Sequence, residues 1–120
     1  MIDHVNIGVS HLDASRRFYE AALAPLGIAY VMQHAAGVGF GRAGRPIFWI
    51  SDRGPSGPLH VAFTSPDRAT VDAFHRAALA AGGRDNGPPG LRAVYHPSYY
   101  GAFILDPDGN NIEAVAHGPG

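Results

Sequence analysis

Hydrophobic and polar residues alternate in two short stretches near the start and the middle of the chain. In residues 4–9, three aliphatic side chains alternate with smaller or polar ones, beginning at His4. In residues 59–64, three apolar side chains alternate with a second series that contains His60. A period of two residues is typical of a β-strand that buries one face. Each stretch is therefore predicted to be a strand whose histidine lies on the face away from the core.

A helix is predicted after each of these strands. The apolar stripes recur at helical spacing and end at glycines, which terminate helices well. The first stripe comprises Phe18, Ala21, Ala22 and Pro25 and ends before Gly27, and the second comprises Val71, Phe74, Ala78 and Leu79 and ends at Gly82-Gly83. Three strand-like runs follow each helix, at 28–34, 37–42 and 46–51 and again at about 92–96, 100–105 and 111–116.

The two halves of the chain also repeat each other in sequence. A shift of 56 positions places His4-Val5 on His60-Val61, the AALA run at 21–24 on that at 77–80, and Gly27 on Gly83. Near the ends of the two halves the offset grows to 65, which overlays Phe48 on Glu113. The additional residues are assigned to 85–100, a Gly-, Pro-, Tyr- and His-rich segment that is typical of a functional loop.

The repeat predicts one α+β domain over residues 1–120. It contains two βαβββ modules, the first at about 1–53 and the second at about 58–117. Their mixed four-stranded sheets are expected to curve around a shared cleft, with the helices outside. A doubly wound sheet is disfavoured because each helix is followed by three hairpin-like strands.

Composition narrows the possible functions. The formal net charge is −1, so neither sign predicts a nucleic-acid groove or an anionic membrane surface. The absence of cysteine excludes disulfides, thiolate metal sites and a cysteine nucleophile. No apolar run is long enough to span a bilayer, and the first residues do not resemble a signal peptide, so a cytoplasmic location is expected.

The last predicted strand contains an acidic residue in apolar surroundings. Glu113 follows Ile112 and precedes Ala114 and Val115, where a carboxylate is costly to bury without a partner. Strand alternation places Glu113 opposite Ile112 and Ala114, on the face predicted for His4 and His60. Two histidines and one carboxylate are a ligand set for Fe, Mn, Zn, Ni or Co. We therefore predict a divalent metal site formed by His4, His60 and Glu113.

Further site residues are predicted around this metal. Tyr99, Tyr100 and His96 in the inserted segment are candidates for catalytic acid or base, although the sequence does not orient them. Phe48, Trp49, Phe103 and Arg92 are candidates for substrate binding, favouring an aromatic or otherwise apolar body. Among the other histidines, His11, His75 and His117 are predicted to lie on the surface.

The chain resembles the vicinal oxygen chelate superfamily. The resemblance rests on the βαβββ repeat and on "DHVNIGV", "LHVAF" and "FILDPDGNNIEAV", and it covers nearly the whole chain. It implies metal ligands at His4, His60 and Glu113, a small-molecule substrate and a homodimer. Glyoxalase I itself is disfavoured, because the position of its second acidic ligand overlays Phe48.

Three functions remain open under this resemblance. The first is a metalloenzyme that chelates two oxygens of a substrate, with lyase, isomerase or dioxygenase chemistry. The second is a metal-free drug- or metabolite-binding protein similar to the bleomycin resistance proteins. The third is a metal-dependent transferase similar to the fosfomycin resistance enzymes.

Overall fold

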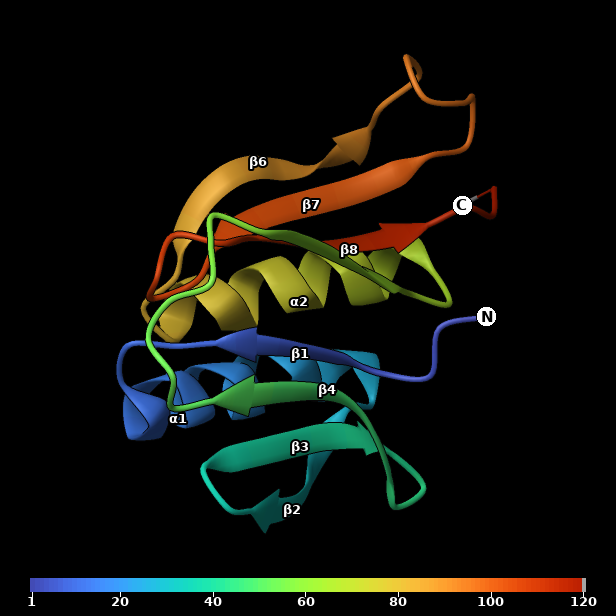
Figure 1. Ribbon diagram of the computed structural model, residues 1–120. Coiled ribbons are helices and arrows are strands. Elements are labelled where there is room, and N and C mark those ends of the chain that lie inside the picture. Colours follow the sequence, from blue (N-terminus) through green and yellow to red (C-terminus); the bar gives the residue numbers. More distant parts are fainter. Residues whose placement is uncertain (120) are drawn as a thin grey trace.

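Two four-stranded sheets, each with one helix on the same side, make up the molecule (Figure 1). The computed structural model describes residues 1–119. The first module contains β1 (Val5–Gly8), α1 (Leu12–Leu23), the 3₁₀ helix η1 (Ala24–Leu26), β2 (Ala29–His34), β3 (Gly37–Arg42) and β4 (Arg45–Ser51). The second contains β5 (His60–Thr64), α2 (Arg68–Ala80), β6 (Arg84–Leu91), β7 (Tyr100–Leu105) and β8 (Asn111–Ala116). The predicted α+β fold of two βαβββ modules is confirmed.

Both sheets have the same mixed topology. The strand order is β1-β4-β3-β2 in the first sheet and β5-β8-β7-β6 in the second. The first and last strands of each module pair in parallel, and the other pairs are antiparallel. In Figure 1 both helices lie behind the sheets, so the opposite face of each sheet, here called its open face, is turned to the viewer.

The hydrophobic core lies between the sheets and the two helices. Its aromatic centre crosses the module boundary, because the ring of Phe48 on β4 lies 5.3 Å from that of Phe63 on β5. Tyr19 on α1 packs edge-on against Phe48 from the helix side. The two modules therefore share one core. Neither helix within residues 1–119 has the length and apolarity needed to cross a bilayer.

The turn between β7 and β8 connects the two modules by hydrogen bonds. Asp106 accepts bonds from the backbone N–H groups of Asp108 and Asn110, as the turn chemistry predicts. Its second oxygen accepts from the hydroxyl of Tyr19, and Asp108 accepts from the N–H of Ser10. The same turn thus closes one hairpin and joins it to the first module.

The segment 85–100, predicted as a loop, begins as a strand. This strand precedes residue 92, so the prediction of a strand at 92–96 is wrong. β6 covers Arg84–Leu91 and pairs with β7 through two register shifts, and the loop is confined to residues 92–99. Gly87, Pro88 and Pro89 conceal this strand in the sequence, because they remove the apolar alternation. Proline is tolerated here because β6 is the outer strand of its sheet.

His75 is buried rather than exposed, which corrects its prediction as a surface residue. Only 8% of it is accessible, and its Nε2 lies 2.9 Å from Asp85 Oδ1 on β6. This hydrogen bond, supported by one from the N–H of Gly87, holds the pKa of the Asp85 carboxyl below its ordinary value.

Asp85→Asn should therefore destabilise the protein in a pH-dependent way. Because the folded pKa is depressed, the stabilisation is present above the unfolded value of about 3.9 and is lost as the pH falls through the lower folded value. Urea midpoints of parent and variant should differ at pH 7 and converge near about pH 2. Exposed Asp52→Asn serves as the control, and an equal difference at both pH values for Asp85→Asn would contradict the assignment.

Candidate functional site

A histidine and a glutamate form a close pair on the open face of the second sheet. His60 begins β5, and Glu113 lies on the adjacent strand β8, opposite Ala62 in the ladder. His60 Nε2 lies 2.9 Å from Glu113 Oε1. The glutamate side chain is 1% exposed, whereas that of His60 is 52% exposed. A buried carboxylate is thus in contact with an imidazole that is itself accessible to solvent.

The other oxygen of this carboxylate is bound by a tyrosine. The Tyr99 hydroxyl donates a hydrogen bond to Glu113 Oε2. Burial, and then the adjacent Glu113, raise the pKa of Tyr99 far above its ordinary value, so the phenol keeps its proton and remains a donor. Gly101 makes room for the pair, since a Cβ there would lie 3.2 Å from Glu113 Oε2. Both carboxylate oxygens therefore have partners within the second module.

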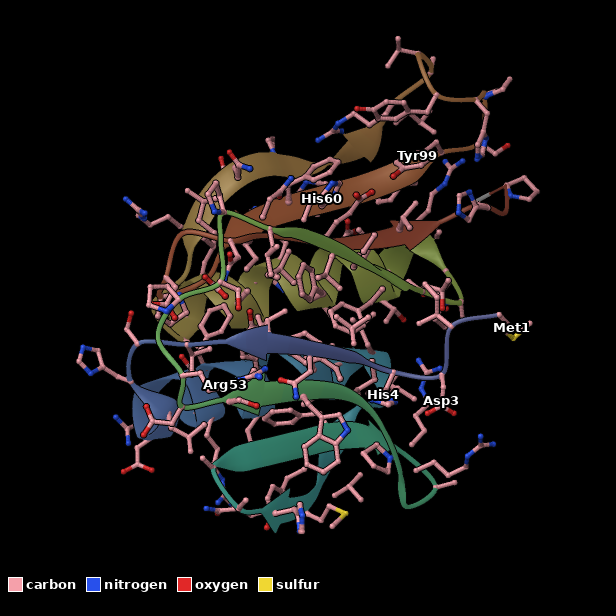
Figure 2. All side chains as sticks on the ribbon, in the orientation of Figure 1. Met1, Asp3, His4, Arg53, His60 and Tyr99 are labelled. Atoms are coloured by element: carbon pink, nitrogen blue, oxygen red, sulfur yellow. The ribbon has the colours of Figure 1, made fainter. Side chains whose placement is uncertain are left out.

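His4 lies on the first module, at the position equivalent to His60. It precedes β1, its side chain is 53% exposed, and its Nδ1 lies 2.8 Å from Asp3 Oδ2. This hydrogen bond lowers the pKa of Asp3. Figure 2 shows His60 and Tyr99 together on one module, and His4 beside Asp3 on the other. Within residues 1–119, no three His, Asp or Glu side chains come close enough to hold a metal ion. Of the three predicted ligands, His60 and Glu113 are in contact on the second module, and His4 lies apart on the first.

The open face of the first sheet carries a cavity of about 690 Å³. Trp49 on β4 lines it, together with Asn6 on β1, which is its partner in the ladder. In the second module the corresponding ladder pair is Ala62 and Glu113, so Trp49 is the structural equivalent of Glu113. The overlay of Phe48 on Glu113 was therefore wrong by one residue. Phe48 is 1% exposed and belongs to the core, which corrects its prediction as an open-face residue.

Comparison with known proteins agrees with this arrangement. Residues 1–114 match the family model of the glyoxalase/bleomycin resistance protein/dioxygenase superfamily. The chain belongs to this superfamily. The expectation from the "DHVNIGV", "LHVAF" and "FILDPDGNNIEAV" motifs is thereby confirmed.

Solved structures of the superfamily share the fold over nearly the whole chain. A glyoxalase/bleomycin resistance protein from Albidiferax ferrireducens T118 is 31% identical, covers 98% of this chain and 99% of its own, and has a TM-score of 0.85. A lactoylglutathione lyase from Agrobacterium tumefaciens is 22% identical, with 97% and 92% covered and a TM-score of 0.72. The second likeness is one of fold alone. A search of curated proteins gave no match.

In this glyoxalase-superfamily protein, the other two predicted catalytic residues, Tyr100 and His96, do not bond to Glu113. The Tyr100 hydroxyl donates to Asp72 on α2, 2.7 Å away, so this side chain faces the helix and not Glu113. His96 lies in the loop before β7, with its Nε2 2.7 Å from Nδ1 of the exposed His117. The His96 ring packs against Tyr99, 5.4 Å between centroids, and not against Glu113.

Two predicted substrate-binding residues lie beside the His60–Glu113 pair. Phe103 is opposite Glu113 on β7, and its ring lies 6.1 Å from that of His60. The Arg92 guanidinium lies 5.4 Å from the Phe103 ring centroid and donates to the Pro88 carbonyl at 2.7 Å. In this superfamily protein Phe103 therefore lies beside the His60–Glu113 pair, and the Arg92 guanidinium lies near the Phe103 ring.

Sequence reasoning missed several residues that line the cavity of the first module. Ser51 donates a hydrogen bond to Asn6 Oδ1 at 2.8 Å, and Arg53 lies just beyond the end of β4. Arg53 was placed at the end of the first module without a role. Strand alternation continued from Trp49 through 51 to 53 would have placed these side chains on one face.

Proposed function

We propose that this protein is a homodimeric, metal-dependent enzyme whose cleft forms between two copies of the chain. His60 and Glu113 of one copy would supply two ligands, and His4 of the other copy would supply the third. The proposal is carried by the 2.9 Å contact between His60 Nε2 and a carboxylate that is 1% exposed. These two side chains lie on adjacent strands at the open face of the sheet, and they would provide two of the three ligands of a 2-His-1-carboxylate metal site.

The position of His4 supports the need for a second copy. The donors of one chain do not fit a metal by themselves, because residues 1–119 bring no three ligands together. His4 occupies the place of His60 in the repeat and is half-exposed on the other module. A dimer that apposes the first module of one copy to the second module of the other would add the missing imidazole.

The metal would act as a Lewis acid that polarises oxygen atoms of the substrate. Fe, Mn, Zn, Ni and Co all suit two imidazoles and one carboxylate. The chain's own residues orient the site: the protonated Tyr99 holds one oxygen of Glu113 and leaves the other toward His60. Phe103 places an apolar ring next to His60.

Glu113→Gln tests this proposal, because it retains the shape of the side chain and removes its charge. Parent protein, purified without chelator or added metal, should contain about one metal per chain by elemental analysis. The variant should bind that metal at least about 100-fold more weakly. Glu20→Gln on the exposed side of α1 is a matched control and should bind as the parent does. Equal metal affinity of Glu113→Gln and parent would overturn the metal site.

A metal-free binding protein is the second candidate. It is favoured by one observation: both oxygens of Glu113 already have partners, so the carboxylate is stabilised without a cation. In that case chelation and metal addition would leave thermal stability and ligand binding unchanged. Thermal melts with EDTA and with added Zn²⁺ or Mn²⁺ distinguish the two candidates, since a resident metal should raise the melting temperature.

A further inference from the structure

Trp49 lies flat on the backbone of β3 because two glycines leave room for it. Its ladder partner is Gly39, where a Cβ would approach two indole ring atoms to 3.1 Å. A Cβ at Gly37 would approach a third ring atom to 3.4 Å. One face of the indole therefore covers the two glycines. The ring is partly exposed and lines the cavity, so the opposite face is available to a ligand.

A cationic side chain lines the same cavity as Trp49. Arg53 lines the cavity and has no ion pair or side-chain hydrogen bond within the part of the chain that the structure describes. Arg45 lies in the field of Asp3, which is already bonded to His4. Figure 2 shows Arg53 at one end of the first sheet and Asp3 with His4 at the other end. Neither arginine forms an ion pair among the described residues, but Arg45 lies near the Asp3 carboxylate, so we take Arg53 as the partner of a bound anion.

The polar group between Trp49 and Arg53 is also arranged as a donor. Ser51 donates its hydroxyl hydrogen to Asn6 Oδ1, 2.8 Å away. This bond turns the amide oxygen of Asn6 toward Ser51. The amide NH2 group of Asn6, a residue that lines the same cavity, can therefore donate to a ligand. The net charge of the whole chain is −1, so this excess of donors and positive charge is local to the cavity.

We propose that the cavity binds a planar aromatic carboxylate, with its ring stacked on Trp49 and its carboxylate paired with Arg53. Aromatic rings stack favourably on an indole face, and a guanidinium binds a carboxylate through two parallel hydrogen bonds. The inference rests on the proposed function, for which it names the substrate class, because a second copy would place this cavity opposite the His60–Glu113 pair. Binding to Trp49 and Arg53 does not itself require metal.

The chain has a single tryptophan, so its fluorescence reports on this cavity directly. Benzoate should change the emission of Trp49 saturably at millimolar concentration, both in protein as purified and after EDTA treatment. Benzamide retains the ring without the charge, and cyclohexanecarboxylate retains the charge without the planar ring. Each should bind at least about 5-fold more weakly than benzoate.

Arg53→Gln should weaken benzoate binding about 10-fold and leave benzamide binding unchanged. Arg84→Gln on β6 of the other module is the matched control and should bind both probes as the parent does. Isothermal titration calorimetry repeats the measurement without relying on fluorescence. The proposal is overturned if benzoate does not saturate the signal in either preparation, if Arg53→Gln binds it as the parent does, or if cyclohexanecarboxylate binds equally well.

Failure of this inference and failure of the metal site are separable. Stoichiometric metal that depends on Glu113, together with no benzoate binding, would reject the substrate class and retain the proposed function. Benzoate binding that depends on Arg53, in a protein that binds no metal, would support the substrate class in a metal-free binding protein.

Discussion

Asp106→Ala should lower the free energy of unfolding by about 3–5 kcal/mol, the range found when one partner of a buried polar network is removed. Asp106 is 3% exposed and accepts four hydrogen bonds, from two backbone N–H groups, the Asn110 amide and the Tyr19 hydroxyl. Tyr19 is fully buried, and burial together with Asp106 raises its pKa well above the ordinary value, so it stays a donor. Without Asp106, its hydroxyl would have no acceptor and the β7–β8 turn would lose two backbone contacts.

Urea unfolding followed by circular dichroism measures this effect. Tyr19→Phe removes only one of the four donors and should cost about 1–2 kcal/mol. Exposed Asp52→Ala, in the connection after β4, is the control and should stay within about 0.5 kcal/mol of the parent. An Asp106→Ala variant that is as stable as Tyr19→Phe would show that the turn does not depend on this carboxylate.

Heterodimers of His4→Ala with Glu113→Gln should recover about half of the parent metal content, although each variant alone binds little. In the proposed dimer each site takes His4 from one copy and His60 with Glu113 from the other. A mixed dimer therefore assembles one intact site and one doubly defective site. Co-expression with two affinity tags, followed by sequential purification, yields this mixed dimer for elemental analysis.

The matched control pairs Glu113→Gln with His60→Ala. Both substitutions lie in the second module, so no arrangement of these two chains restores a complete site across the interface. This heterodimer should bind as little metal as the single variants. Equal metal content in the two kinds of heterodimer, or failure to recover any doubly tagged species, would contradict a site shared between copies.

The elements with strict periodicity could be predicted from the sequence. Alternation in β1, β5 and β8, together with the 56-residue repeat, placed His60 and Glu113 on one face, and the two side chains are in contact. The cost of an unpaired carboxylate indicated that Glu113 needs a partner, and a metal ion was predicted in that role; the structure shows that His60 and Tyr99 bond to it. Tyr99 and Tyr100 are adjacent and point in opposite directions, toward Glu113 and Asp72. Where a strand begins decides which tyrosine faces the site, and that boundary follows from tertiary pairing.

A one-residue error in the repeat accounts for the wrong placement of Phe48. The offset of 65 overlays Phe48 on Glu113, whereas the ladders pair Asn6 with Trp49 and Ala62 with Glu113. A slip of one position exchanges the two faces of a strand, so a core residue was predicted on the open face. The burial of His75 was missed for a different reason: its partner Asp85 lies on a strand that the sequence had concealed.

The prolines of β6 also limit how copies of this chain can associate. β6 is the outer strand of the second sheet, and Pro88 and Pro89 offer no N–H along that edge. An additional strand could not form a regular ladder there, so end-to-end growth into a continuous β-ribbon is blocked at this side of the molecule. Copies that associate through the second sheet would therefore have to use its open face rather than this edge, which favours a closed assembly over an open-ended polymer.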